Sequence, residues 1–410
     1  MEPAQVAVPG SVIQEVQRGL ANPIGMPRLS ELARPGMKIA LVIDDHSRPT
    51  PVAQILPAVL EELRQAGIDP AQVTLIPATG LHIPMTADEV RQRVGNPDLY
   101  GLHLLNHDCD DLEKLVFLGT TGRGSPVYVN KLVVESDLIV SIGCIDPHLI
   151  ASFGGGYKNL VPGVAGRLTT AHNHSLNCTP GTFNSVGQPI DLNPMRLDLE
   201  EAAAMLKPPV FIVNAVINAN LDVVRLVCGD PLEAHRQGAG TSRAIYGVAI
   251  PSMADIVISD SHPMDIDLRQ GVKALGNTVR ALHPGGVMIT CIRAEAGVGV
   301  FGLANRKLPL GRKALKFLAP LLLLLVPRLK LKGMGEEDRF FLYFALQAMR
   351  RGDLLVYAPT IPMETRANLP FVTFVESLEA GLAFAKAKFP HKATVLVFPH
   401  GGSTFPILPN

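Results

Sequence analysis

The sequence predicts an α/β fold with two α/β domains, mostly parallel sheets and a cleft between the domains that holds the active site. Three observations lead to this prediction. Short apolar runs alternate with amphipathic helical segments, polar clusters follow the runs, and the pattern restarts near residue 250. Strands that alternate with helices imply parallel sheets, in which ligands bind beyond the carboxyl ends of the strands. We expect an N-terminal domain over residues 1–253 and a C-terminal domain over residues 254–410.

The first domain begins with an arm over residues 1–35, which contains a short amphipathic segment near 13–20. A capping box at Thr86 to Glu89 opens one of its helices. An amphipathic helix over residues 52–66 ends before Gly67. Buried strands are expected at four apolar runs, which are residues 38–44, 73–76, 138–142 and 210–214.

The second domain repeats the pattern, with strands expected at residues 254–258, 286–290, 353–357 and 394–398 and a helix over 267–282. The most apolar run, Phe317 to Pro327, is too short to span a bilayer and contains Pro320. We interpret it as a buried helix. An oligomer contact and a peripheral membrane contact are the alternatives, because basic residues flank the run on both sides.

Composition excludes several classes of protein. Lys+Arg and Asp+Glu are both 37, so the formal charge is zero, which argues against a general nucleic-acid or membrane-surface binder. The five cysteines form no C-x-x-C pair, which argues against a disulfide scaffold or a zinc–thiolate site. The N-terminus has neither a basic nor an apolar leader segment. We therefore expect a cytoplasmic protein without stable membrane insertion.

The stretch from Gly143 to Gly163 is the centre of the predicted site. It follows a buried strand and contains His148, three glycines at 154–156 and Lys158. The two polar residues can serve one site only if the chain bends between them, and glycines permit that bend. The spacing is not that of a phosphate-binding P-loop. Lys158 therefore remains a candidate for a phosphate contact, a Schiff-base lysine or a covalent tether.

Other polar groups lie near strand ends or on the predicted helix. Arg48 can bind a carboxylate or phosphate with two hydrogen bonds, or it can neutralise Asp44 or Asp45. His82, like His148, is by itself more typical of a packing residue than of a catalyst. His172 and His174 share a face on a strand but not on a helix, and either is a metal ligand or part of a polar loop.

Gln270 and Lys273 are three residues apart, so they share one face of the predicted helix. That face lies either toward the cleft or toward solvent.

Taken together, five motifs resemble the lactate racemase family, the nickel-dependent 2-hydroxyacid racemases and epimerases. The motifs are DDHSRPTP, ATGLH, the His148–Lys158 stretch ending in NLVPG, the NH of His174, and D-x-D-x-x-Q-x-x-K at residues 265–273. They occur in the order that the family has, and the resemblance covers most of the chain. The resemblance implies two α/β domains with the site between them. It also implies a nickel-pincer nucleotide, a pyridinium-3-thioamide-5-thiocarboxylic acid mononucleotide that carries nickel.

The same resemblance implies a role for each residue. Lys158 would be the lysine joined to the cofactor and His174 the protein ligand to nickel. The two acid/base histidines would be His82 and His148. The residues that bind the substrate would be Arg48, Gln270 and Lys273. The further contacts to the cofactor would be Asp45, Gly154, Gly155 and Gly156. The implied reaction moves a hydride reversibly from Cα of a 2-hydroxy acid to the tethered ring, while the histidines handle the hydroxyl proton.

Two alternatives remain open: a metal-free racemase with two bases, and a non-catalytic carrier of the nickel nucleotide. The sequence departs from the family pattern at His46, at Tyr157 with its preceding glycines, and in having no tryptophan. These departures leave open which 2-hydroxy acid, including longer ones and sugar acids, is the substrate. Expected partners are that substrate, the enzymes that synthesise the cofactor, and a second copy of the chain.

Overall fold

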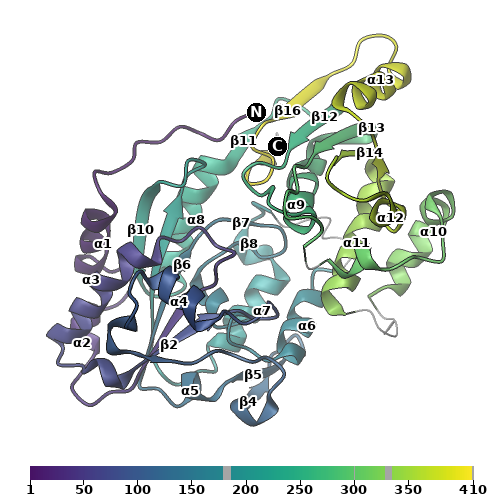
Figure 1. The fold of residues 1–410 in the computed structure, drawn as a ribbon. Helices are drawn as coiled ribbons and strands as arrows, with labels where there is room; N and C mark the ends of the chain where they lie inside the picture. The colour runs from purple at the N-terminus through teal and green to yellow at the C-terminus, as the bar shows by residue number, and fades with distance from the viewer. Residues whose placement is uncertain (179–185, 300, 328–334, 409–410) are drawn as a thin grey trace.

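The structure, a computed structural model, describes residues 1–178, 186–299, 301–327 and 335–408. Two mostly parallel sheets organise the chain, one from each half of the sequence (Figure 1). The first has six strands in the order β10-β9-β6-β1-β2-β3, and the second has five in the order β15-β14-β13-β12-β16. All neighbouring strands in these two sheets are parallel except β9 and β10. The predicted fold class is confirmed.

The first sheet contains all four strands that the apolar runs predict, together with two strands at its edges. Its members are β1 (Ile39–Asp44), β2 (Val73–Ala78), β3 (His103–Leu104), β6 (Leu138–Cys144), β9 (Val210–Ile217) and β10 (Val223–Gly229). The run in β1 is continuous because both faces are buried. Leu41 and Ile43 pack into one core cluster, whereas Ala40 and Val42 pack into another.

Helices cover both faces of this sheet (Figure 1). The cluster on the first face includes residues from α1 (Val12–Ala21), α2 (Leu29–Leu32), α3 (Val52–Gln65) and α4 (Ala87–Val94). The cluster on the second face includes residues from α5 (Lys131–Val134), α7 (Pro194–Ala203), α8 (Glu233–Tyr246) and the hairpin of β4 (Leu115–Thr120) with β5 (Pro126–Asn130). The capping box at Thr86 is confirmed at the start of α4. The N-terminal segment is less of a loose arm than expected, because α1 packs against α3 and β10.

The second sheet contains β12 (Ala254–Asp260), β13 (Leu282–Cys291), β14 (Gly352–Tyr357), β15 (Thr373–Phe374) and β16 (Val395–Phe398). Its helices are α9 (Leu268–Thr278), α10 (Arg312–Leu325), α11 (Glu336–Arg351), α12 (Met363–Ala367) and α13 (Leu378–Lys388). The four predicted strands are therefore present. The larger core cluster joins α9, α10 and α11 to one face of the sheet.

The two ends of the chain connect the two halves. β11 (Gly247–Ala249) pairs with β17 (Phe405–Ile407). The amino group of Met1 donates to the Val397 carbonyl at 2.7 Å, and the Ala4 N–H donates to the Ile245 carbonyl at 2.7 Å. The predicted domain boundary between residues 253 and 254 falls immediately before β12, and the division into two domains at that point stays a prediction.

The interpretation of Phe317–Pro327 as a buried helix is wrong. α10 lies at the edge of the molecule and contacts α11 with only one stripe of residues (Figure 1). Leu315, Ala319 and Leu323 are buried, whereas Phe317 is 84% exposed and Leu324 is 54% exposed. Arg328, Lys330 and Lys332 in its basic flank lie outside the described residues. Within the described ranges, no helix has the length and apolarity needed to cross a membrane.

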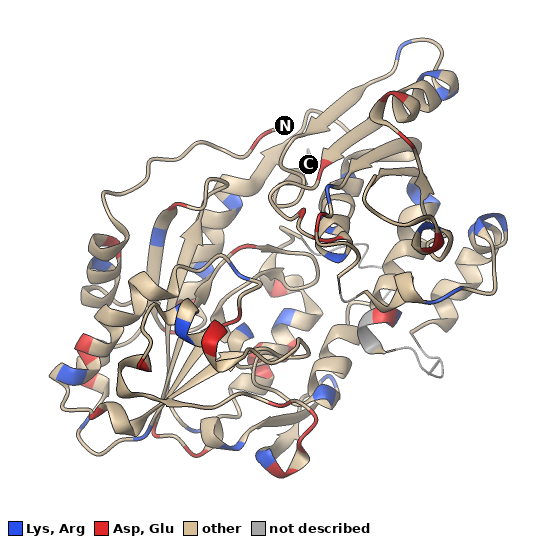
Figure 2. Ribbon diagram, in the orientation of Figure 1, with Lys and Arg blue, Asp and Glu red and all other residues tan. Residues whose placement is uncertain are grey.

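Charged side chains are interspersed along the whole chain. Figure 2 shows Lys and Arg alternating with Asp and Glu over both halves of the ribbon. This distribution agrees with the balanced formal charge.

Strand order determines where a ligand site belongs. β1 pairs with β2 on one side and with β6 on the other, so the direction of winding changes between β1 and β6. Crevices at such points, beyond the carboxyl ends of the strands, are the usual ligand sites of parallel sheets.

Candidate active site

A cavity lies beyond the carboxyl ends of β1, β2 and β6, at the predicted point. It encloses about 1270 Å³, including space open to solvent, and α9 and α11 of the second half line it as well. Eight of the predicted site residues line this one cavity: Asp45, Arg48, His82, His148, Lys158, His174, Gln270 and Lys273. The expected convergence of strand-end groups is therefore observed.

The turn after β1 is held by its first aspartate. Asp44 is buried, accepts a hydrogen bond from Thr50 Oγ1 at 2.5 Å, and pairs with Arg93. Asp45 caps the same turn by accepting from the Ser47 N–H at 3.0 Å. Both aspartates of the DDHSRPTP segment therefore hold the turn, and both line the cavity.

Arg48 pairs with a residue that the sequence analysis missed. Its Nη1 lies 2.9 Å from Asp146 Oδ2, and both side chains are largely buried. Burial opposes the charge of Arg48, but Asp146 together with Cys144, Asp45 and Asp44 outweighs burial and raises the pKa of Arg48. Asp146 is the hydrogen-bonded partner, whereas Asp44 and Asp45, the partners that the simpler alternative supposed, act on Arg48 only through their charge. Asp146 lies two residues after the end of β6, so the rule that strand-end polar groups meet could have found it.

His82 is oriented by Asp45. Its Nδ1 lies 2.5 Å from Asp45 Oδ2. Burial alone would raise the pKa of Asp45, but the hydrogen bond and charge of His82, together with Ser47 and Arg48, outweigh burial and lower it. An ionised carboxylate accepts hydrogen bonds only, so Nδ1 of His82 carries a proton and Nε2 is the nitrogen left for proton exchange with a ligand. The carboxylate expected at the nucleotide thus contacts a predicted catalytic histidine.

His148 has the opposite proton arrangement. Its Nδ1 accepts the N–H groups of Ile150 at 3.3 Å and Ala151 at 3.2 Å. Burial and the nearby Lys158 hold the pKa of His148 well below its usual value, so the ring is neutral and Nε2 carries its proton. The cavity therefore holds one histidine arranged as a base and one arranged as a hydrogen-bond donor.

Lys158 and His174 are half-buried, and their charged forms are disfavoured. Burial, aided by Arg48, lowers the pKa of Lys158 to about 7, and burial lowers the pKa of His174 to about 3. A neutral amine is a nucleophile and a neutral imidazole is a metal ligand. Both groups are thus available for bond formation near neutral pH.

The two histidines of TTAHNHS lie on the helix α6 (Arg167–Ser175), so the strand alternative is wrong. Positions two apart on a helix point in different directions. His172 Nδ1 lies 2.8 Å from Ser125 Oγ, whereas His174 lines the cavity. Helical geometry therefore separates a packing histidine from a site histidine.

The bend between His148 and Lys158 is built as expected, although the glycines do not touch the cavity. Gly155 and Gly156 have φ of +72° and +62°, a conformation that residues with a side chain avoid. Residues 154–156 are absent from the described lining of the cavity and are buried behind it. Their observed role is to turn the chain so that His148 and Lys158 reach one space.

Gln270 and Lys273 approach from α9, which Asp267 caps by accepting the Gln270 N–H at 2.7 Å. Both residues line the cavity, so the face they share is turned to it and not only to solvent. Burial lowers the pKa of Lys273 to about 8. Thr79 also lines the cavity, and its buried Oγ1 has no hydrogen-bond partner among the described residues.

Metal coordination by protein side chains alone has little support in this cavity. Within the described part of the chain, the only group of three His, Cys, Asp or Glu side chains with converging ligand atoms is Asp108, Cys109 and Asp110. None of these residues lines the cavity, and Arg167 already pairs with Asp110 at 2.6 Å. A metal on His174 would need ligands supplied by a cofactor.

Comparisons with known proteins point to one family. The sequence profile described as the lactate racemase N-terminal domain matches residues 1–183. The lactate racemase of Thermoanaerobacterium thermosaccharolyticum is 33% identical over 286 residues, which cover 69% of this chain and 66% of that protein. The lactate racemase of Lactiplantibacillus plantarum is 31% identical over 289 residues, which cover 70% of this chain and 67% of that protein. The matched region thus spans about two thirds of each relative.

Solved structures extend the likeness over nearly the whole chain. The apoprotein of the Thermoanaerobacterium thermosaccharolyticum lactate racemase superposes with a TM-score of 0.83 at 28% identity, covering 97% of this chain and 93% of that one. A protein from Thermotoga maritima superposes with a TM-score of 0.69 at 17% identity, covering 97% and 98% respectively, and shows the fold alone.

The fold, the site and these relatives define an enzyme of the isomerase class, as predicted. More particularly, the chain belongs to the lactate racemase family.

Proposed function

We propose that the protein racemises or epimerises a 2-hydroxy acid with a nickel-pincer nucleotide attached to Lys158. One observation carries the proposal: Lys158 and His174 line the same cavity as two histidines with opposite proton arrangements. A carrier would need the tether and the metal ligand but not the oriented histidines. The relatives named lactate racemase support the reaction class.

The residues fit this cofactor. Lys158 offers a half-buried amine with a pKa of about 7, suited to forming a covalent bond. His174 offers a neutral imidazole, a type of ligand that suits nickel. Thr79 Oγ1 is buried without a partner among the described residues, as expected of a group whose partner belongs to a ligand.

When bound, the nucleotide supplies a ring that accepts a hydride from Cα and returns it. The protein supplies the proton chemistry and the grip on the substrate. His82 Nε2 takes the hydroxyl proton of one enantiomer, and Asp45 stabilises the imidazolium that forms. Arg48 and Lys273, with Gln270, bind the carboxylate and hydroxyl. General acid–base help of this kind is worth about 10²–10⁴-fold.

His148 becomes the acid as the site fills. The causes that lower its pKa are burial, then Lys158, Arg48 and Lys273. Attachment of the cofactor removes the charge of Lys158, and a substrate carboxylate offsets the charges of Arg48 and Lys273. Both changes favour a second proton on His148, which would go on Nδ1 and displace the N–H contacts of Ile150 and Ala151. The protonated ring would then deliver its Nε2 proton to the substrate oxygen, and for the other enantiomer the two histidines would exchange roles.

The proposal also includes the binding partners of the protein and its cellular compartment. The partners are the 2-hydroxy acid and the enzymes that synthesise the cofactor. All five cysteines are free thiols, which fits a reducing cytoplasm.

The test is the intact mass of protein produced together with the cofactor-synthesis enzymes, followed by peptide mapping and a chiral assay of many 2-hydroxy acids. We expect an adduct on Lys158 and racemisation of at least one acid, with both lost in Lys158→Ala. Racemisation without an adduct would favour the metal-free enzyme. An adduct without turnover of any acid would favour the carrier.

A further inference from the structure

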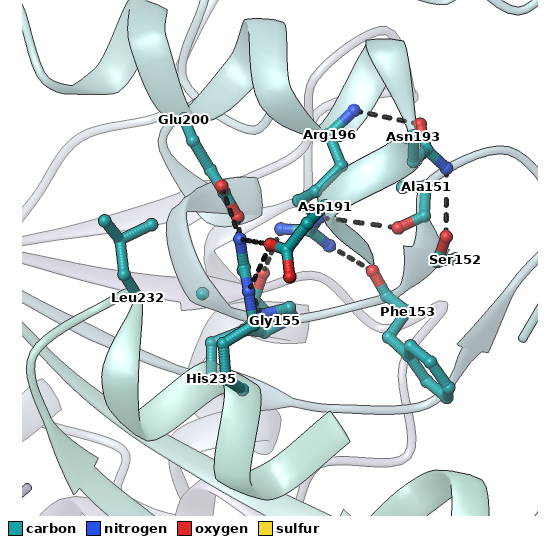
Figure 3. A network of polar contacts seen from close by, with 12 residues as sticks. Ala151, Ser152, Phe153, Gly155, Asp191, Asn193, Arg196, Glu200, Leu232 and His235 are labelled. Atoms are coloured by element: carbon teal, nitrogen blue, oxygen red, sulfur yellow. Dashed lines mark hydrogen bonds and ion pairs between the residues drawn. The ribbon is translucent and has the colours of Figure 1, made fainter. Parts of the chain in front are cut away.

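The loop that joins His148 to Lys158 contains a short antiparallel pair, β7 (Pro147–His148) with β8 (Ser152–Phe153), and is otherwise held by side chains. Five backbone carbonyls between Ile150 and Gly155 accept hydrogen bonds from side chains of α7, α8 and the residue before α7. Figure 3 shows the contacts that reach Ala151, Phe153 and Gly155. These side chains determine the backbone conformation of the loop, because glycine itself tolerates many conformations.

Arg196 of α7 makes three of these contacts. Its side chain is fully buried, with Nε donating to the Ala151 carbonyl at 3.4 Å, Nη1 to the Gly155 carbonyl at 3.2 Å, and Nη2 to the Phe153 carbonyl. Burial lowers the pKa of Arg196 to about 10, so the guanidinium is charged near neutral pH. A rigid fork of donors matched to three carbonyls fixes the path of the loop between them.

Among the described residues, no carboxylate forms an ion pair with Arg196, although the charge of Glu200 favours the cation. The nearby Glu200 contacts Arg236 with both oxygens, at 2.7 and 2.9 Å. Burying a charge is costly unless hydrogen bonds and opposite charges compensate it. Here carbonyls of the loop compensate it, so the position of the cation and the path of the loop depend on each other.

His235 of α8 holds the middle of the loop. Its Nε2 lies 2.9 Å from the Gly154 carbonyl, and burial with the charge of Arg196 keeps its pKa well below the usual value. The neutral ring therefore donates through Nε2–H, while Nδ1 faces Arg236 Nη1 at 3.3 Å. A Cβ at Gly156 would lie 3.0 Å from the His235 ring, so the ring also packs on the glycine backbone.

Two asparagines also hold the loop, and together with Arg196 and His235 they form a set of four side chains that we call the cradle. Asn193 Nδ2 donates to the Ile150 carbonyl at 3.0 Å, and Asn214 Oδ1 accepts the Gly156 N–H at 2.8 Å. The cradle therefore extends along the loop to Gly156, two residues before Lys158.

We propose that Arg196 and His235 are positioning residues that hold the glycine loop so that the Lys158 amine faces the cavity, ready for covalent attachment. Neither residue lines the cavity, so they position Lys158 through the backbone, while the charge of Arg196 also lowers the pKa of Lys158 directly. Arg196→Lys keeps that charge and therefore separates the two effects. The inference rests on the proposed role of Lys158 as the cofactor tether. Without the cradle the glycines would sample other conformations, and the amine would seldom be near its reaction partner.

The test uses full-length Arg196→Met, Arg196→Lys, His235→Leu and His235→Gln. Arg18→Met is the control, because Arg18 also donates to a backbone carbonyl, that of Leu226 at 2.9 Å, but its side chain is 47% exposed and does not line the cavity. The first readout is the fraction of protein carrying the adduct, by intact mass. The second, on apoprotein, is the pH profile of Lys158 acetylation by acetic anhydride, by peptide mass spectrometry.

We expect Arg196→Met to lower the adduct fraction at least ten-fold and to move the acetylation midpoint of Lys158 upward by a pH unit or more. His235→Leu should act in the same direction, and the Lys and Gln variants should recover part of the effect. Arg18→Met should lower the melting temperature without changing either readout.

A folded Arg196→Met protein with a normal adduct fraction and an unchanged acetylation profile would overturn the inference. If the wild type forms no adduct, the proposed function fails, while the acetylation profile of the apoprotein still decides whether the cradle positions Lys158. If Arg196→Met does not fold, Arg196→Lys and His235→Gln decide the outcome by the same two readouts.

Discussion

His82 Nδ1 and Asp45 Oδ2 lie 2.5 Å apart at the carboxyl edge of the first sheet. The two residues come from loops after neighbouring parallel strands, β1 and β2. This contact fixes which nitrogen of His82 is basic, and the proposed chemistry depends on that choice.

Asp45→Asn should lower kcat/KM for racemisation by about 10²-fold, because the amide does not stabilise the imidazolium and also allows the wrong tautomer. The variant should still carry the adduct on Lys158, which the intact mass of the protein measures. Steady-state kinetics with each enantiomer is the measurement. Unchanged kinetics in protein carrying the full adduct would show that Asp45 does not orient a catalytic base.

The pair of Arg48 and Asp146 gives a prediction about stability. Asp146→Asn leaves the buried guanidinium with less compensation and should lower the free energy of unfolding by about 3 kcal/mol. The double variant Arg48→Met/Asp146→Asn should recover part of this loss, since it removes both charges. Denaturant unfolding of the two single variants and the double variant measures the coupling. Additive losses would mean that the pair does not interact energetically.

Gly155→Ala should destabilise the protein by about 2 kcal/mol or more. Its φ is +72°, and an added Cβ would lie 2.6 Å from Ile145 Cγ1 and 2.8 Å from Asn214 Oδ1. Gly240→Ala is the matched control, because that glycine lies inside α8 with no atom within 4 Å of the new Cβ and should stabilise by about 0.5–1 kcal/mol. Thermal or denaturant unfolding of both variants compares them. Equal effects at the two positions would contradict the observed loop.

The stability of the apoprotein should depend on pH through Lys158. Its pKa is about 7 in the folded state and near the ordinary 10.5 when unfolded, so between these values unfolding takes up a proton. Stability relative to Lys158→Met should therefore rise with pH from about 7 to about 10, by at most about 1.4 kcal/mol per pH unit. Denaturant unfolding at pH 7, 8 and 9 gives this difference. A difference that does not change with pH would place the amine in water.

Much of the fold follows from local pattern. The eight predicted strands are present because each is an apolar run with at least one face buried in a sheet, and apolar runs are recognisable without knowledge of their neighbours. Strand-end groups converge because parallel strands present their carboxyl ends at one edge. The motifs therefore predicted which residues line the cavity.

The remaining features depend on packing between distant segments. The partner of Arg48 is Asp146, 98 residues away, and sequence spacing does not reveal it. The role of Arg196 could not be predicted from the sequence, because its hydrogen-bond partners are backbone carbonyls, which every residue has. The exposed face of α10 was missed because an apolar run reveals hydrophobicity but not which side a neighbouring helix covers.

The central claim is that Cα of the substrate gives up a hydride to an attached ring and receives the same one back. The most direct measurement follows a 2-hydroxy acid that the protein racemises, with deuterium at Cα, through racemisation in ordinary water by adduct-bearing protein. We predict that both enantiomers at equilibrium keep the deuterium. Replacement of deuterium by solvent hydrogen at the rate of racemisation would contradict the account and indicate proton removal by two bases.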